Sequence, residues 1–347
     1  MTVRRCQATA CVLALAAVAV RAQASPALSP QAPEAALARA DVEAARQGLG
    51  RHEFAEVHFG AIPVELTLYA RDAEKARAAS RLAFARVAEL AAMMSDYALD
   101  PPSALNRIAA DAPAAVSVPP ELFAALARAK TLHRDTDGAF DITAKPFVQL
   151  WRVAQRVGEL PPADRLRRAR EFVDVAALEL DPDARTARLG RPGRWLDLGG
   201  LAKGQIGDEV VRLLAEHGVP ICRYHAGGDM VFGDAPPGLP GWPVRVADLH
   251  VEGEDPLAFW TCNAAASVSG DVFRFVEIDG VRYSHVIDPR TGLGVTSRKL
   301  ACVRGPRGID TDALATAGVI LDAPAWQRAL ARVPGCRGSV TRVQGSR

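Results

Sequence analysis

Apolar and polar residues alternate from Phe54 to Ala70, as in a strand with one buried face. The apolar positions of this stretch are Val57, Phe59, Val64, Leu66 and Leu68. From Asp72 to Met94 the chain is rich in alanine and its apolar residues recur at helical spacing. This second pattern predicts a long amphipathic helix.

Further along the chain, helical and strand-like patterns alternate only in part. The spacing predicts helices over Pro119–His133, Ala202–His217 and Asp312–Leu321, with Gly218 ending the second. Strands are predicted over Ile221–Phe232, Val244–Ala247 and Phe273–Ile278, with a hairpin turn at Asp279-Gly280. This mixture predicts an α+β fold.

The composition favours one large globular domain. The chain has 347 residues, of which 49% are hydrophobic, too many for a disordered protein. We place the domain at residues 51–333 and a tail without a recognised motif at 334–347. The net charge is +2, with acidic and basic residues mixed, so a clustered nucleic-acid surface is not indicated.

The N-terminus has the three parts of an export signal. Arg4 and Arg5 precede the apolar run Cys11–Val20, and Ala22-Gln23-Ala24 supplies small residues for a signal peptidase. The run is shorter than the roughly 20 residues that span a bilayer. We therefore expect a signal peptide at 1–24, a leader at 25–50 and a periplasmic protein, with an uncleaved anchor and inner-membrane association as the alternative.

Four cysteines follow the expected signal peptide: Cys222, Cys262, Cys302 and Cys336. None is in a CxxC pair or near a histidine at zinc-site spacing. One or two disulfides are compatible with an oxidising compartment, and so are four free thiols.

Two glycine-containing stretches carry polar residues where a core position would be apolar. Residues 136–151 read TDGAFDITAKPFVQLW, in which Gly138 permits a positive φ beside Asp137 and Asp141. Residues 196–210 read LDLGGLAKGQIGDEV, in which a glycine turn enters a helix next to Lys203. Such a helix start suits a phosphate. Ordinary turns before helices are the alternative for both.

Two further stretches carry candidate catalytic and metal-binding groups. His285 lies in SHVIDPRTG, beside Asp288 and Arg290, after Ser269-Gly270-Asp271. Asp312 and Thr316 are four residues apart in a predicted helix, so both side chains reach one cation such as Mg²⁺. The alternatives are a structural histidine and N-capping by Asp310, Thr311 or Asp312.

In this order, and with AGGD at Ala226–Asp229, the stretches resemble the ApbE family, the FAD:protein FMN transferases. The resemblance covers most of residues 54–322. It implies a T-fold-like α+β domain that binds FAD and Mg²⁺. It also implies transfer of FMN to a Thr or Ser hydroxyl of a target flavoprotein, periplasmic or membrane-associated, with release of AMP.

The resemblance also implies roles for individual residues. Those matching flavin-site positions are Phe59, Tyr97, Ala139, Phe140, Asp141, Asp197, Lys203 and His285, with His285 also implicated in transfer. Those matching metal ligands are Asp312 and Thr316 through side chains, and Gly200 and Ile309 through backbone oxygens. Phe59-Gly60-Ala61 departs from the family's usual Met-Gly-Thr.

Two other functions stay open at this point. One is an FAD-binding protein or FAD pyrophosphatase that gives FMN and AMP without modifying a protein. The other is a periplasmic binder of lipid or a thiamine-related compound that has no enzymatic activity. The intact SHVIDP and DALAT segments favour the transferase.

Overall fold

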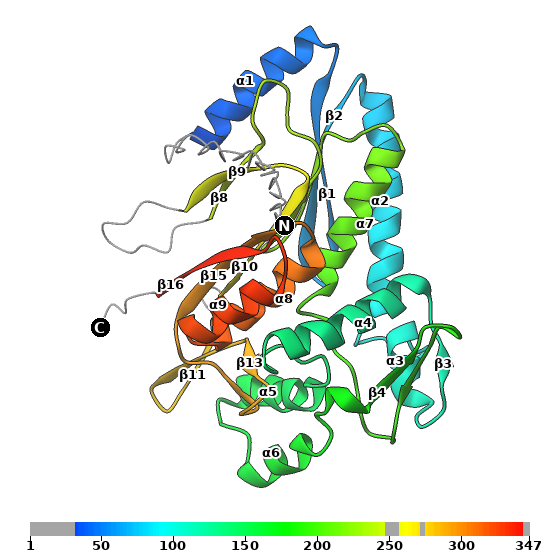
Figure 1. The fold of residues 1–347 in the computed structure, drawn as a ribbon, viewed down its shortest axis with the longest axis vertical. Helices are drawn as coiled ribbons and strands as arrows, with labels where there is room; N and C mark the ends of the chain where they lie inside the picture. Colours follow the sequence, from blue (N-terminus) through cyan, green and yellow to red (C-terminus); the bar gives the residue numbers. More distant parts are fainter. Residues whose placement is uncertain (1–31, 247–256, 271–274, 343–347) are drawn as a thin grey trace, which may run out of the picture.

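The computed structural model describes residues 32–246, 257–270 and 275–342 (Figure 1). The signal-peptide region and Asp271 lie outside these ranges. Within them, no helix is both long enough and apolar enough to cross a membrane.

A seven-stranded sheet, antiparallel throughout, organises the described chain. Its order is β1-β2-β6-β7-β10-β15-β16. The strands are β1 Gly50–His58, β2 Ile62–Ala70, β6 Cys222–Ala226, β7 Asp229–Phe232, β10 Ala264–Gly270, β15 Lys299–Gly305 and β16 Arg337–Arg342. Strand β16 lies in the segment predicted to be a tail, so that prediction is wrong for residues 337–342.

Three helices cover one face of this sheet: α2 Ala73–Met94, α7 Ala202–Glu216 and α8 Gly308–Ile320. Helix α2 packs on β1 and β2, α7 lies beside α2 and packs on β6 and β7, and α8 packs on β10 and β15 (Figure 1). The main core lies between these layers and includes Leu66, Val210 and Leu314, each almost completely buried. Because successive side chains of a strand point to opposite faces, every second residue of these strands faces this core.

The opposite face carries a smaller core under α1 Ala32–Arg46 and the hairpin of β8 Trp242–Arg245 and β9 Ala258–Thr261. Ala44, Tyr69 and Trp242 are buried there, and the Tyr69 hydroxyl donates to Asp41 at 2.9 Å. Residues 32–46 are therefore packed on the domain. The predicted domain start near residue 51 therefore leaves out this helix, which lies in the segment predicted to be a leader.

The remaining elements extend from the helical face. They are α3 Ala104–Ala110, α4 Pro120–Asp135, α5 Lys145–Val157, α6 Ala163–Arg170, α9 Ala323–Arg332, the 3-10 helix Val175–Ala177, and the small sheet of β3 Val116–Ser117, β5 Thr186–Leu189 and β4 Leu178–Asp181. Two short hairpins complete the chain: β11 Phe275–Ile278 with β12 Val281–Ser284, and β13 Ile287–Asp288 with β14 Leu293–Gly294.

Most predicted elements form, with shifted ends. Helix α2 is capped by Asp72, which accepts from the Lys75 N–H at 2.7 Å, and α7 ends just before Gly218, whose φ is +72°. The alternating stretch 54–70 is two paired strands with a turn at 59–61 rather than one strand. Helix α8 begins at Gly308, four residues before the predicted start.

Helices α7 and α8 cross at two glycines, and this crossing positions the predicted site. A Cβ atom built on Gly204 would lie 2.0 Å from the Gly308 carbonyl oxygen, and one built on Gly308 would lie 2.3 Å from the Gly204 oxygen. Any side chain would separate the helices. The close approach brings Lys203, at the start of α7, next to Asp312 in α8.

Candidate active site

Lys203 lies between two buried carboxylates from different parts of the chain. Its Nζ is 3.0 Å from Oδ2 of Asp229, the first residue of β7, and 3.3 Å from Oδ2 of Asp312. It also donates to the carbonyl oxygen of Gly199 at 3.2 Å. We call Lys203, Asp229 and Asp312 the carboxylate cluster.

The carboxylate cluster has an excess of negative charge because two acids share one ammonium. Burial raises the pKa of Asp312 to about 7, with a further contribution from the neighbouring Asp229 carboxylate. Burial by itself would lower the pKa of Lys203, but Asp229 and Asp312 hold it well above its usual range. The ammonium is therefore charged at neutral pH, and the cluster favours a further cation.

Asp312 does not cap its helix. The N-terminus of α8 is capped from α7 by Asp208, whose carboxylate accepts from the N–H groups of Gly308 at 2.6 Å and Ile309 at 3.1 Å. Asp310 pairs with Arg128 and Arg307, while Asp312 Oδ2 accepts from the Gly204 N–H at 3.3 Å. The capping alternative for residues 310–312 is therefore wrong.

The structure brings Gly200, Phe140 and Thr316 together beside the carboxylate cluster. A Cβ atom built on Gly200 would lie 3.1 Å from the Phe140 ring and 3.5 Å from Thr316 Oγ1. Thr316 follows Asp312 by one turn of α8 and is only partly buried. Ile309 is in the first turn, with its side chain in the main core. A metal role for the Ile309 carbonyl stays a prediction.

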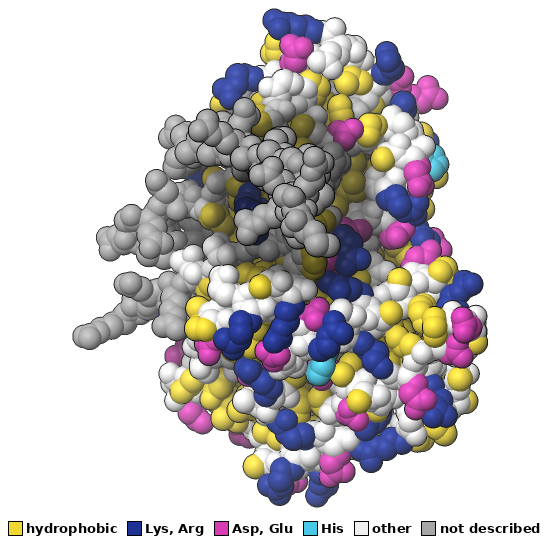
Figure 2. All heavy atoms as spheres, viewed as in Figure 1, with side chains coloured by type: hydrophobic (Ala, Val, Ile, Leu, Met, Phe, Trp, Pro, Cys, Tyr) yellow, Lys and Arg dark blue, Asp and Glu magenta, His cyan; other side chains and the backbone are white. Residues whose placement is uncertain are grey.

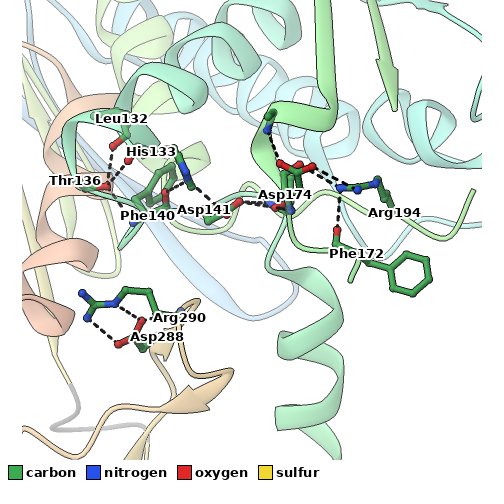
Figure 3. A network of polar contacts seen from close by, with 12 residues as sticks. Leu132, His133, Thr136, Phe140, Asp141, Phe172, Asp174, Arg194, Asp288 and Arg290 are labelled. Atoms are coloured by element: carbon green, nitrogen blue, oxygen red, sulfur yellow. Dashed lines mark hydrogen bonds and ion pairs between the residues drawn. The ribbon is translucent and has the colours of Figure 1, made fainter. Parts of the chain in front are cut away.

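The GAFD turn is held by local hydrogen bonds (Figure 3). The Phe140 N–H donates to Thr136 Oγ1 at 3.1 Å, and His133 Nδ1 lies 3.1 Å from the Phe140 oxygen and 3.4 Å from Asp141 Oδ2. Gly138 has a φ of +78°, as predicted. Ala139 and Phe140 are buried, so the turn is a rigid wall of the site.

A second charged group surrounds the exposed ring of Tyr97. The Arg152 guanidinium lies over this ring, 4.6 Å from its centroid, and Tyr97 is 71% exposed. Asp96 Oδ2 is 3.4 Å from Arg152 Nη2 and 3.7 Å from Lys145 Nζ. We call Asp96, Tyr97, Lys145 and Arg152 the Tyr97 group.

Asp197 connects the Tyr97 group to the carboxylate cluster through the segment 197–203. Its carboxylate accepts from the Gly199 N–H at 2.8 Å. Burial raises its pKa, the Asp96 charge adds to this, and the Gly199 hydrogen bond and the cations of Arg152 and Lys145 oppose it. Asp197 therefore lies within electrostatic range of the Tyr97 group.

Phe59 occupies the turn between β1 and β2 with a φ of +51°, a conformation that a bulky residue rarely adopts. Its side chain packs against the main core and its ring centroid is 6.4 Å from that of His58. None of the described contacts joins Phe59 to the carboxylate cluster or to the Tyr97 group. Its predicted flavin contact is not tested by this geometry.

His285 is exposed on a loop that its neighbours hold firmly. The Ser284 Oγ accepts from the Val286 N–H at 3.0 Å. Asp288 and Arg290 form a two-pronged ion pair, with both oxygen–nitrogen distances 2.8 Å (Figure 3). His285 itself is exposed.

Sequence reasoning missed three functional candidates in this region: Asp208, Lys145 and Arg152. Asp229 was noted only as the last residue of the AGGD motif. Each acts on a partner far away in the chain, and single-sequence spacing does not reveal such pairs.

The four cysteines that follow the expected signal peptide are all free thiols in the described residues, so the disulfide alternative is not observed. Figure 2 shows basic side chains interspersed with acidic ones over the lower half of the molecule.

Comparison with known proteins gives a consistent result. The family model described as the ApbE family matches residues 61–338. The FAD:protein FMN transferase of Treponema pallidum is 34% identical over 247 residues, which cover 67% of each chain. That of Klebsiella pneumoniae is 30% identical over 54% of this chain and 57% of its own length.

Solved structures show the same fold. The ApbE protein of Thermotoga maritima aligns with a TM-score of 0.73 at 22% identity, covering 85% of this chain and 97% of its own. The flavinyl transferase ApbE of Pseudomonas stutzeri, in its apo form, aligns with a TM-score of 0.71 at 22% identity, covering 85% and 96%. The predicted α+β fold is confirmed.

Proposed function

Because the chain belongs to the ApbE family, we propose that it transfers FMN from FAD to a side-chain hydroxyl of a target protein and releases AMP. The observation that carries this proposal is the convergence of Lys203, Asp312 and Thr316 at the N-terminus of α7. The N-cap residue Leu201 makes no side-chain cap, Asp312 accepts from the Gly204 N–H of the first turn, and the helix dipole adds positive charge there. The arrangement suits a pyrophosphate.

The residues present fit a magnesium ion. The described chain has no group of three His, Cys, Asp or Glu side chains placed to bind a metal. Mg²⁺ does not need one, because it is commonly held by one or two carboxylates, water and substrate phosphate. Asp312 shares the single Lys203 ammonium with a second carboxylate, so a further cation would favour its ionised form, and the Thr316 hydroxyl lies one turn away. Gly200, against Thr316, can add a backbone oxygen.

Lys203 would bind the pyrophosphate of FAD, and Asp312, Thr316 and Gly200 would hold Mg²⁺. When bound, the metal supplies positive charge to the phosphate oxygens. Phe140 and Asp141 would border the FMN half, and Asp197 would connect it to Tyr97. These assignments place the reacting phosphorus at the junction of α7 and α8.

His285 is the proposed general base. A neutral imidazole can accept the proton of a Thr or Ser hydroxyl. The hydroxyl oxygen forms a bond to the FMN phosphorus, and the bond to the AMP phosphate oxygen breaks with its electron pair leaving on AMP. Because His285 is exposed, an acceptor protein can reach it, and so can water. Attack by water would give FMN and AMP.

The location and the acceptor are also proposals. The residues Ala22-Gln23-Ala24 after an apolar run support export to the periplasm, with the mature chain starting at Ser25. The acceptor would then be a periplasmic or membrane-associated flavoprotein. N-terminal sequencing that finds Met1 on a cytoplasmic protein would contradict export.

The test combines purified protein, FAD, Mg²⁺ and candidate acceptors. Intact-mass measurement of the acceptor should show an added FMN, and chromatography should show AMP in equal amount. Release of AMP with no acceptor modified would favour the pyrophosphatase. No AMP and no bound flavin would contradict both functions.

A further inference from the structure

Asp229 is the closer of the two carboxylates that hold Lys203. The distances from Lys203 Nζ are 3.0 Å to Asp229 and 3.3 Å to Asp312. Asp229 and Asp312 are each 3% exposed, so neither charge is screened by bulk water. The position of the ammonium between the two therefore decides how much of the Asp312 charge it neutralises.

The fold gives Asp229 a fixed position. It begins β7, pairing with Ala226 of β6 and with Ser267 of β10. The preceding Gly228 lies against β10, where its carbonyl accepts from the Val268 N–H at 2.8 Å. Asp229 is thus anchored in the middle of the sheet, whereas Lys203 has a flexible four-carbon side chain. The Asp229 carboxylate therefore sets the position of the Lys203 ammonium.

Asp312 has a second task in the proposed function, as the anionic ligand of Mg²⁺. An ammonium paired with Asp312 alone would compete with the metal for this carboxylate. We propose that Asp229 is a positioning residue that draws Lys203 away from Asp312 and leaves it available for Mg²⁺. The proposal rests on the proposed function, because it assigns the metal to Asp312.

The experiment measures flavin binding rather than transfer, so it needs no acceptor protein. FAD affinity is read from flavin fluorescence, first in EDTA and then over a range of Mg²⁺ concentrations. In Asp229→Asn the ammonium keeps Asp312 as its charged partner, beside the Gly199 carbonyl oxygen, and the cluster loses one negative charge. A neighbouring unit charge shifts a carboxylate by about 1–3 pKa units, so we expect the Mg²⁺ midpoint to rise about tenfold or more.

In EDTA the same variant should bind FAD at least as tightly as the wild type, because a negative charge near the pyrophosphate is gone. Asp310→Asn is the matched control. Asp310 is an equally buried carboxylate on α8, but it pairs with Arg128 and Arg307. This control should lose stability and keep the wild-type Mg²⁺ midpoint.

A folded Asp229→Asn with an unchanged Mg²⁺ midpoint overturns the proposal, and so does an equal rise in the Asp310→Asn control. Should Asp229→Asn fail to fold, Asp229→Glu replaces it, since the longer side chain moves the carboxylate relative to Lys203. An unchanged midpoint there also overturns the proposal. A wild type that binds no FAD at any Mg²⁺ concentration instead contradicts the proposed function.

Discussion

The carboxylate cluster and the Tyr97 group lie at opposite ends of the segment 197–203 and differ in charge balance. In the carboxylate cluster, two acids share one ammonium. In the Tyr97 group, Asp96 is near two cations, and the charge of Asp197 brings the total to two acids and two bases. Only the first has an excess charge that a metal can neutralise.

Exposure separates the two regions further. Asp229 and Asp312 are almost completely buried, whereas the Tyr97 ring is largely in solvent. A buried charge that loses its partner is not rescued by water, while an exposed contact is partly replaced by hydration. Substitutions in the carboxylate cluster should therefore have large effects and those at the Tyr97 ring small ones.

The largest effect is expected for Asp312→Ala. It removes the anionic metal ligand from the cluster, so Mg²⁺-dependent transfer should be abolished. AMP release and FMN attachment are measured against Mg²⁺ concentration for both proteins. Activity with an unchanged Mg²⁺ midpoint in a mildly destabilised variant would mean that Asp312 has only a structural role.

His285→Ala is next, and it tests a residue outside both regions. A general base contributes about 10²–10⁴-fold, so single-turnover transfer should slow by that factor. FAD should still bind, because Lys203 is unchanged. A wild-type rate would exclude His285 from the mechanism.

Lys203→Met allows the half-buried lysine of the carboxylate cluster to be compared with the buried lysine of the Tyr97 group. A hydrogen bond to a charged group contributes about 1.5–3 kcal/mol, so FAD affinity should fall about 10- to 100-fold. The control is Lys145→Met, which removes the buried lysine of the Tyr97 group. Both variants should be destabilised. Equal losses of FAD affinity in Lys203→Met and Lys145→Met would show that the carboxylate cluster and the Tyr97 group contribute equally to FAD binding.

Local features of this fold were predictable, and long-range pairs were not. The Asp72 cap, the Gly218 stop and the hairpin at Asp279-Gly280 involve neighbours in the chain. The Asp208 cap of α8 joins residues about a hundred positions apart, and only the glycine crossing makes it. The sequence indicated correctly that Asp312 and Thr316 lie on one face of a helix, because they are close in the chain. It could not show which residue caps that helix, because the cap comes from Asp208.

The first helix and the last strand of the described chain show the same limit of sequence-based prediction. Ala36, Ala40 and Ala44 are fully or almost fully buried, yet alanine at helical spacing also occurs in unpacked leaders. Strand β16 is paired with β15, but its sequence is polar because it is an edge strand. The family and the flavin transferase class were predicted from the order of five motifs and are confirmed by the relatives.

Asp208 gives a pH-dependent test of the α8 position. Burial raises its pKa from 3.8 to about 6 in the folded chain. A raised carboxyl pKa stabilises the fold at low pH, and this contribution is lost as the pH rises through about 6. Without Mg²⁺, the free energy of unfolding should therefore fall between pH 4 and 6 by up to about 3 kcal/mol, at 1.36 kcal/mol per pKa unit. Denaturant melts of Asp208→Asn should show a smaller slope, because only groups such as Asp312, whose pKa is also raised, still contribute; an unchanged slope would assign it wholly to other groups.

The smallest effect is expected for Arg152→Ala, in the exposed half of the comparison. The guanidinium contacts the Tyr97 ring, and an exposed cation–π contact contributes about 0.5–1 kcal/mol. If the flavin ring binds against Tyr97, its loss should weaken FAD binding about two- to fivefold. Affinity for ADP should stay unchanged, because ADP has no flavin ring.

Arg156→Ala is the control for this measurement. Arg156 is an exposed arginine one turn further along α5, and none of the described ion pairs involves it. Its removal changes the net charge equally and should leave both affinities unchanged. A loss of affinity for FAD and ADP alike in Arg152→Ala would mean that Arg152 acts on the phosphates through its charge. The Tyr97 group would then contribute to anion binding. The division between a carboxylate cluster that binds the metal and a Tyr97 group that binds the flavin ring would be wrong.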